Sequence, residues 1–337
     1  MSQTLQVVIV PSPGMGHLIP FIEFAKHLVH FHDYFNVTCI IPAIGSPPDA
    51  MKASLLALPP NINHIFLPPI IFEEDQYNYS EVGNEVLIFL AMTRSLPSLR
   101  HILKSLIETN TRVVAFLVDF FGTAAFDVAN EFNLSSYLFF TSNAMALSTG
   151  FYLPKLDRMV SREYRDLPEL VKIPGCVPVH GRDIGEPFQD RKSDTYKLFL
   201  NIMRRFGLTK GIILNTFIDI EAGALKALME EEEEYSGEVR PPIYPIGPLI
   251  RAGSREQKMN AVMLNKDVKV ALRPKVHKED DGSVIREEIA IVVKELMEGE
   301  EGKKVHKRMR EILKDAALKA LMEDGASRKA LLKLALE

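Results

Sequence analysis

The stretch that decides the fold is VVIVPSPGMGH, residues 7–17. It opens on a short run of β-branched residues, as a buried parallel strand does, and continues into a turn of proline, serine and glycine. Apolar residues then recur at helical spacing over residues 18–28. A buried strand, a tight turn and an amphipathic helix together predict the first unit of an α/β sheet.

The same alternation continues through the first two-thirds of the chain. Further strands are predicted at residues 37–41, 65–67, 113–118, 137–140 and 211–215, and helices at residues 85–106 and 122–132 and from near residues 144 and 220. Strands that alternate with helices in this way predict a parallel sheet covered by helices, which is the α/β class.

The pattern changes near residue 235. A five-residue acidic run at 230–234 is followed by a Pro-rich connector at 240–248, and such a connector marks a domain boundary. Beyond it the apolar residues have helical spacing, and only residues 268–272 are spaced like a strand. We therefore expect two domains, at residues 1–250 and 251–337, the second of them mostly helical.

Composition excludes several classes of protein. The 337 residues carry a net charge of −4, which gives no basic surface for nucleic acid or an anionic membrane. The two cysteines, Cys39 and Cys176, cannot build a disulfide framework or a zinc site. No window approaches 18 consecutive apolar residues, and the first residues lack a basic signal region, so we expect a cytoplasmic protein without a membrane span.

Two residues at strand ends are candidates for catalysis. His17 follows the first strand, and an imidazole there can act as a general base; the simpler interpretation is a helix cap or a loop contact. Asp119 ends the strand at 113–118 and so reaches the same edge of a parallel sheet. Its carboxylate could fix the tautomer of His17, or cap the following helix, or do both.

Other candidate sites have weaker support. His27, His30 and His32 cluster near a helix end, but no Cys or acidic residue at ligand spacing accompanies them, so no metal site is expected. Gly14 and Gly16 would let a ligand approach the backbone closely. A nicotinamide enzyme stays an alternative, although the third glycine of the dinucleotide fingerprint is missing and so is the acidic residue after the second strand.

Several motifs resemble the plant family 1 UDP-glycosyltransferases, and most closely their hydroquinone (arbutin-forming) and monolignol glucosyltransferase branch. They are PSPGMGHLIP at residues 11–20, VDFFGT at 118–123 and YPIGPL at 244–249, and the resemblance resumes at EQKMNA, residues 256–261. The family implies a GT-B fold: here a complete Rossmann-like N-terminal domain that binds the acceptor, followed by a truncated helical remnant of the UDP-sugar-binding domain.

The resemblance also implies residue roles. His17 would deprotonate the acceptor hydroxyl with Asp119 as its partner, and glucose would pass from UDP-glucose to a small phenol with inversion. The donor would lie near Ser12, Gly14, Gly16, Glu256 and Gln257, and the acceptor near Glu85, Phe120 and Phe121. UDP-glucose would be a co-substrate, and no cofactor is implied. For Phe120, packing in the core is an alternative to acceptor binding.

One family segment is missing from this sequence. Between about residues 250 and 256 the chain lacks the block that builds most of the donor-binding domain, and it contains no tryptophan, a residue the family keeps there. We expect an internal deletion, by alternative splicing or a gene-model error, that removes most activity. The alternative function is non-catalytic binding of a phenolic ligand or partner, and apolar stripes left in the tail would favour self-association.

Overall fold

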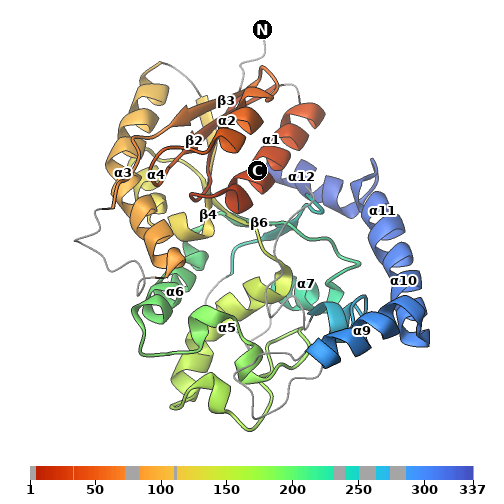
Figure 1. The fold of residues 1–337 in the computed structure, drawn as a ribbon. Coiled ribbons are helices and arrows are strands. Elements are labelled where there is room, and N and C mark those ends of the chain that lie inside the picture. The colour runs from red at the N-terminus through yellow and green to blue at the C-terminus, as the bar shows by residue number, and fades with distance from the viewer. Residues whose placement is uncertain are drawn as a thin grey trace.

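The computed structural model describes residues 5–32, 34–72, 83–109, 112–230, 240–249, 263–273 and 286–336. In these ranges seven parallel strands form one sheet in the order β3-β2-β1-β4-β5-β6-β7 (Figure 1). The strands are β1 Leu5–Val10, β2 Phe35–Ile41, β3 Ile62–Phe66, β4 Arg112–Asp119, β5 Ser136–Phe140, β6 Gly211–Leu214 and β7 Ile243–Pro245. The first six overlap the predicted strands, whereas β7 lies inside the predicted connector.

Helices connect the strands and form the tail. They are α1 Met15–Phe31, α2 Asp49–Leu56, α3 Asn84–Glu108, α4 Ala125–Glu131, α5 Ala144–Met159, α6 Asp194–Arg204, α7 Ala222–Met229, α9 Arg286–Glu298, α10 Glu300–Met309, α11 Ala317–Leu321 and α12 Ala326–Leu336. Single 3-10 turns are η1 Phe120–Gly122, η2 Tyr164–Asp166, η3 Gly181–Asp183, η4 Glu186–Phe188 and η5 Phe206–Leu208, and π-helical turns are η6 Met263–Asp267 and η7 Arg310–Ala316.

The core lies on both faces of the sheet, because successive side chains of a strand point to opposite faces. Val8 and Val10 of β1 belong to the cluster that α3, α4, α5, α6 and α7 cover. Val7 and Ile9 belong to the cluster that α1, α2 and α12 cover. The sheet is therefore the middle layer of three, and its loops at the carboxyl ends of the strands are left to form a site.

Helix α3 has an unusual composition. Among the described helices it alone is long and apolar enough to cross a membrane by length and composition. Its buried residues Met92, Leu99 and Leu103 belong to the core cluster that packs on the sheet. A single such helix is weak evidence for a membrane span, since a helix at the core of a globular domain passes the same test.

The tail packs against the sheet-bearing part of the chain at several places. Met263, Val268 and Val270 are buried in the first core cluster, and Leu331 of α12 is buried in the second, beside α1 (Figure 1). The expected strand at 268–272 is wrong: Lys269 has a φ of 59°, which interrupts an extended conformation. The division into domains at residue 250 stays a prediction.

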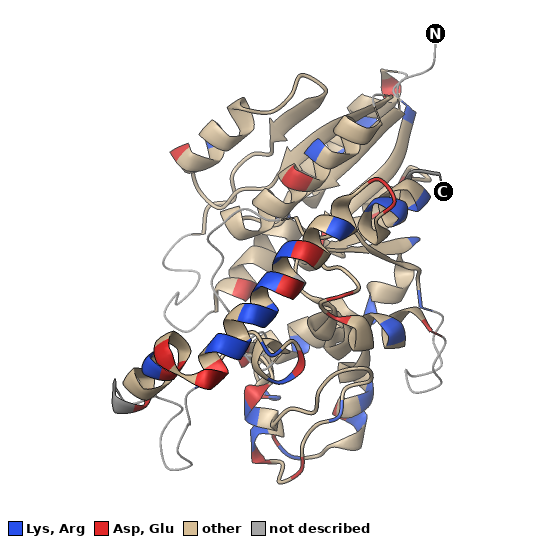
Figure 2. Ribbon diagram, turned by 90° about the vertical axis from the view of Figure 1, so that its right-hand side faces the viewer, with Lys and Arg blue, Asp and Glu red and all other residues tan. Residues whose placement is uncertain are grey.

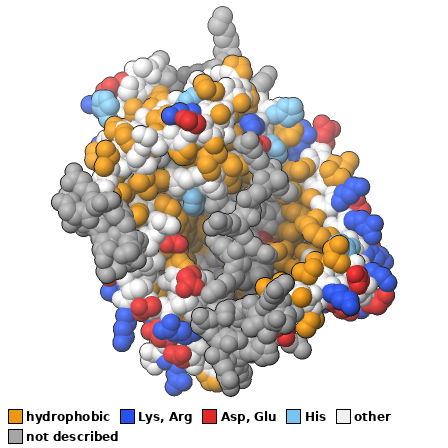
Figure 3. Space-filling model, in the orientation of Figure 1, with side chains coloured by type: hydrophobic (Ala, Val, Ile, Leu, Met, Phe, Trp, Pro, Cys, Tyr) orange, Lys and Arg blue, Asp and Glu red, His pale blue; other side chains and the backbone are white. Residues whose placement is uncertain are grey.

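Charged and apolar side chains occupy different sides of the tail helices. Figure 2 shows Lys, Arg, Asp and Glu alternating along the outer side, where ion pairs such as Lys303–Glu300 and Lys304–Glu301 form. Figure 3 shows apolar side chains on the side that faces the rest of the molecule. Ile291, Val293 and Met297 of α9 are exposed. The self-association expected from such residues stays a prediction.

Candidate active site

The two candidate catalytic residues meet because of the strand order. β1 and β4 are neighbours, and Val10 is the register partner of Val118. The sheet runs to β3 on one side of this pair and to β7 on the other, so the connections diverge here, as at the usual ligand-binding crevice of open α/β sheets. His17 lies in the first turn of α1, and Asp119 is the last residue of β4.

His17 and Asp119 form a close ion pair. The Nδ1 atom of His17 lies 2.5 Å from Oδ2 of Asp119, whose side chain is fully buried, whereas that of His17 is 25% exposed. Asp119 also accepts the backbone N–H of Ser12 at 3.2 Å and that of Phe120 at 2.7 Å. The carboxylate therefore both caps η1 and orients the imidazole, which leaves Nε2 as the nitrogen available to a ligand.

The environment changes the proton affinity of both groups. Burial lowers the pKa of His17, but the charge of Asp119 and the short contact with it raise the pKa more, so that it lies above the ordinary 6.5. Burial raises the pKa of Asp119, but His17 and the two backbone N–H donors lower it below the ordinary 3.8. An imidazole whose basicity is raised by a carboxylate that stays ionised beside it is suited to accepting a proton from a hydroxyl.

A cavity of about 520 Å³ opens next to His17. Its walls are mainly aromatic and aliphatic, with a few polar groups from loops and helix ends. The lining residues are His17, Asn84, Glu85, Ile88, Phe120, Phe121, Phe140, Thr141, Ser142, Ala146, Thr149, Gly185, Glu186, Pro187, Phe188, Phe199 and Met203. Such a cavity fits a flat, largely apolar ligand with one or two polar groups.

All three predicted acceptor residues line this cavity. Glu85 lies in the first turn of α3, and Phe120 and Phe121 follow Asp119 directly. Phe121 also meets His17 edge to face, with ring centroids 5.7 Å apart. Phe120 contacts Phe199 as well, at 5.3 Å between centroids, so it packs in the core and lines the cavity at the same time.

The predicted donor residues lie beside the cavity or outside the described residues. Ser12 is 2% exposed, and its Oγ has no hydrogen-bond partner among the described residues. Gly14 has a φ of 118°, a conformation that favours glycine; around Gly16, apart from its chain neighbours and the backbone of its own helix, no atom of the described residues lies within 4 Å of where a Cβ would be. None of the three lines the cavity. Glu256 and Gln257 fall outside the described residues.

Sequence reasoning missed several cavity residues. Thr141 and Ser142 directly follow β5, and the rule that placed Asp119 could have placed them. Phe199 and Met203 are four residues apart on one face of α6, a helical spacing visible in the sequence. No local signal marks residues 185–188, which lie in irregular structure between α5 and α6.

A buried carboxylate holds one side of the cavity in place. Glu221, at 2% exposure, accepts the backbone N–H groups of Ala144 and Met145 at 2.9 and 3.0 Å and the hydroxyl of Thr216 at 2.6 Å. Burial raises the pKa of Glu221 above its ordinary value. The start of α5, which supplies Ala146 to the cavity, is thereby tied to the loop after β6.

The described residues offer no metal centre: none of their His, Cys, Asp and Glu side chains form a group of three or more that could hold an ion. Nothing in the geometry of the His17–Asp119 pair requires one. The arrangement can accept a proton at His17 Nε2 from a hydroxyl in the cavity.

No protein-family model matches the chain. Hydroquinone glucosyltransferase from Rauvolfia serpentina is 38% identical over 473 aligned positions, which cover 99% of this chain and 98% of that protein. UDP-glycosyltransferase 72B1 from Arabidopsis thaliana is 34% identical over 475 positions, with 100% and 96% covered. The structure of Phytolacca americana UGT2 complexed with UDP-2fluoro-glucose and pterostilbene has a TM-score of 0.90 at 34% identity, and the match covers 100% of this chain and 99% of that one.

The first alignment also measures what is missing. It has 473 positions and this chain has 337 residues, so at least 136 positions of the alignment have no residue of this chain. The predicted shortening of the family's sequence is therefore confirmed. From the extent of these matches and the parallel sheet they share, the chain belongs to the plant UDP-glycosyltransferases and has their α/β fold of the GT-B type in a shortened form.

Proposed function

We propose that the chain binds a small phenolic acceptor in the cavity beside His17, and that the reaction of this site is glucose transfer from UDP-glucose to the phenolic hydroxyl. The observation that carries the proposal is the 2.5 Å His17–Asp119 pair at an aromatic cavity of about 520 Å³. The names of the similar proteins support it, since one is a hydroquinone glucosyltransferase and another was solved with a UDP-sugar analogue and pterostilbene.

The proposed step is a direct displacement. Nε2 of His17 takes the proton of the acceptor hydroxyl, while Asp119 stabilises the imidazolium that forms. The acceptor oxygen bonds to the anomeric carbon of glucose from one side, and the bond from that carbon to UDP breaks on the other. The anomeric configuration is therefore inverted, and UDP leaves with the electron pair of the broken bond.

The shortened chain makes one half of this site. By family resemblance, the residues that bind the nucleotide lie in the missing block. Holding both reactants in position lowers a reaction barrier by on the order of 7–11 kcal/mol. We therefore propose that this chain transfers glucose far more slowly than its longer relatives. Its second candidate function, favoured by the 136 or more missing positions, is phenol binding without turnover.

The test combines binding with turnover on the purified 337-residue chain. We expect saturable binding of hydroquinone, and little glucoside from UDP-glucose and hydroquinone by chromatography. Glucoside formation that disappears in His17→Ala would support the transferase for this chain itself. Binding with no glucoside would support the second candidate. A folded chain that binds no phenol would refute both.

A further inference from the structure

One wall of the cavity is built from residues that the sheet does not position. This acceptor wall, residues 185–188, contains η4 and lies within the irregular segment that joins α5 to α6. Its Phe188 is buried and meets Phe199 of α6 edge to face, with ring centroids 5.4 Å apart. Because no strand fixes this segment, the shape of the cavity depends on the contacts that tie the segment down.

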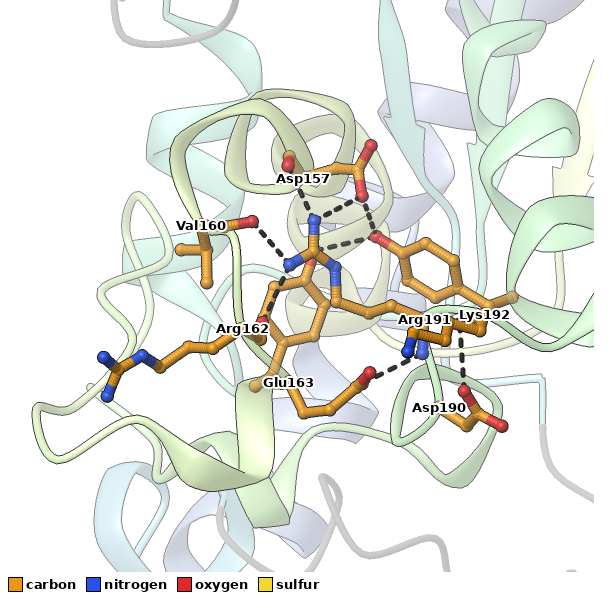
Figure 4. A network of polar contacts seen from close by, with 9 residues as sticks. Asp157, Val160, Arg162, Glu163, Asp190, Arg191 and Lys192 are labelled. Atoms are coloured by element: carbon orange, nitrogen blue, oxygen red, sulfur yellow. Dashed lines mark hydrogen bonds and ion pairs between the residues drawn. The ribbon is translucent and has the colours of Figure 1, made fainter.

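The first tie is Arg191, at the α6 end of the segment (Figure 4). Its guanidinium donates to the carbonyl oxygens of Asp157, Val160 and Arg162 at 2.8, 2.5 and 2.8 Å, and to the Asp157 carboxylate at 2.9 Å. Tyr196 of α6 donates to the same carboxylate at 2.6 Å. These bonds join the end of α5 to the start of α6 and close the base of the segment.

The second tie comes from the tail. The guanidinium of Arg273 meets the carboxylate of Asp183 through two bonds, of 2.7 and 3.2 Å. Asp183 is 6% exposed, ends η3 and stands two residues before Gly185, where the acceptor wall begins. On the other side of the wall, the amide of Gln189 donates to the carbonyl oxygens of Gly181 and Ile184. The turn that leads into the wall is thus held at both of its ends.

Arg273 itself stands on an anchored stretch of chain, which we call the strap, residues 263–273. Met263, Val268 and Val270 of the strap are buried in the core cluster that also contains Phe188. The Arg308 side chain of α10 donates to the Val268 carbonyl oxygen at 2.5 Å. The strap therefore fixes Arg273 relative to both the core and the tail helices, and a fixed guanidinium can in turn fix its carboxylate partner.

We propose that Arg273 is a positioning residue for acceptor binding, which holds the acceptor wall in place through Asp183. The inference rests on the proposed function and gives the tail a role on the acceptor side of the site. A two-bond Arg–carboxylate contact fixes direction as well as distance. Without Arg273, the nearly buried carboxylate of Asp183 has no cationic partner, and its free energy falls if it turns toward water. That movement would displace the acceptor wall from the cavity.

The binding test compares variants of the full chain. We expect Arg273→Gln and Asp183→Asn to weaken hydroquinone binding at least about 5-fold by calorimetry, and Arg273→Lys, which keeps the charge, to recover part of the loss. The matched control is Arg100→Gln, which breaks the two-bond Arg100–Glu131 pair between α3 and α4 and should leave binding unchanged. Unchanged binding in Arg273→Gln, measured where thermal scans show it fully folded, would overturn the proposal.

A spectroscopic test separates positioning from general stability. Because the chain has no tryptophan, Phe188→Trp places its one tryptophan, which can be excited selectively over tyrosine, in the acceptor wall. Adding Arg273→Gln should shift its emission to longer wavelength as the wall becomes wetter, and adding Arg100→Gln should not. A lower unfolding temperature without an emission shift would mean a merely structural role and overturn the proposal. This readout needs no ligand, so it stands even if the chain binds no phenol.

Discussion

Val10 and Val118 are register partners in adjacent parallel strands, and this pairing brings together His17 and Asp119, the proposed catalytic pair. Both strands end at the same edge of the sheet, so the turn after Val10 and the residue after Val118 emerge side by side. His17 lies in the first turn of the helix that follows, and Asp119 stands at the strand end, with 2.5 Å between Nδ1 and Oδ2. The sheet therefore fixes Asp119 directly and places the start of α1, which carries His17, beside it.

The first prediction concerns the proton affinity of His17. In the unchanged chain, NMR titration should give His17 a pKa above 6.5, because Asp119 outweighs the effect of burial. Asp119→Asn removes the charge and leaves burial, so the His17 pKa should fall below 6.5. His27 is the internal control: burial lowers its pKa, and it should titrate below 6.5 in both proteins. A His17 midpoint that does not move in Asp119→Asn would contradict the coupling.

The second prediction concerns stability against pH. A histidine whose pKa is raised in the folded state stabilises the fold fully below its unfolded pKa of about 6.5, and this contribution is lost as pH rises through the folded pKa. The unfolding free energy should therefore fall between pH 6 and pH 9 by about 1.4 kcal/mol for each tenfold gain in proton affinity. His17→Gln should lack this fall in urea titrations. Parallel curves for the two proteins would be inconsistent with a raised pKa.

The third prediction compares two glycines of the first turn. Gly14→Ala puts a Cβ on a residue with φ of 118° and ψ of 147°, close to a region essentially restricted to glycine, and should cost about 1–3 kcal/mol of unfolding free energy. Gly16→Ala adds a Cβ inside α1 that meets no described residue outside the local helix backbone within 4 Å, and it should stabilise the fold by up to about 1 kcal/mol. Urea unfolding measures both. Equal losses would show that the turn conformation is not what requires glycine here.

The fourth prediction tests how the tail packs on the sheet. Leu331 of α12 is 4% exposed in the second core cluster, so Leu331→Ala should cost about 2–5 kcal/mol. Its neighbour Leu332 is 37% exposed, and Leu332→Ala should change stability by no more than about 0.5 kcal/mol. Two similar, small effects in thermal unfolding would mean that α12 does not dock where it is described.

The sequence is a good guide where function and fold follow from short-range patterns. Buried apolar runs predicted six strands, and strand-end logic predicted the meeting of His17 and Asp119. β7 was missed because prolines flank and end it. A strand was wrongly expected at 268–272 because the spacing of apolar residues does not reveal the positive φ of Lys269. The acceptor wall was missed for another reason: Arg191 and Arg273 hold it through partners distant in sequence.

The last prediction concerns a chain into which the missing block has been inserted. Inserting between residues 250 and 256 the segment by which hydroquinone glucosyltransferase exceeds this chain should supply the nucleotide side of the cleft. Since positioning of both reactants is worth on the order of 7–11 kcal/mol, glucoside formation from UDP-glucose and hydroquinone should rise at least about a thousandfold. His17→Ala in the lengthened chain should remove most of the gain, because His17 is the proposed base. Equal turnover with and without the block would mean that the 337 residues already bind the donor productively. It would contradict the proposal that this chain binds the acceptor while the missing block binds the nucleotide.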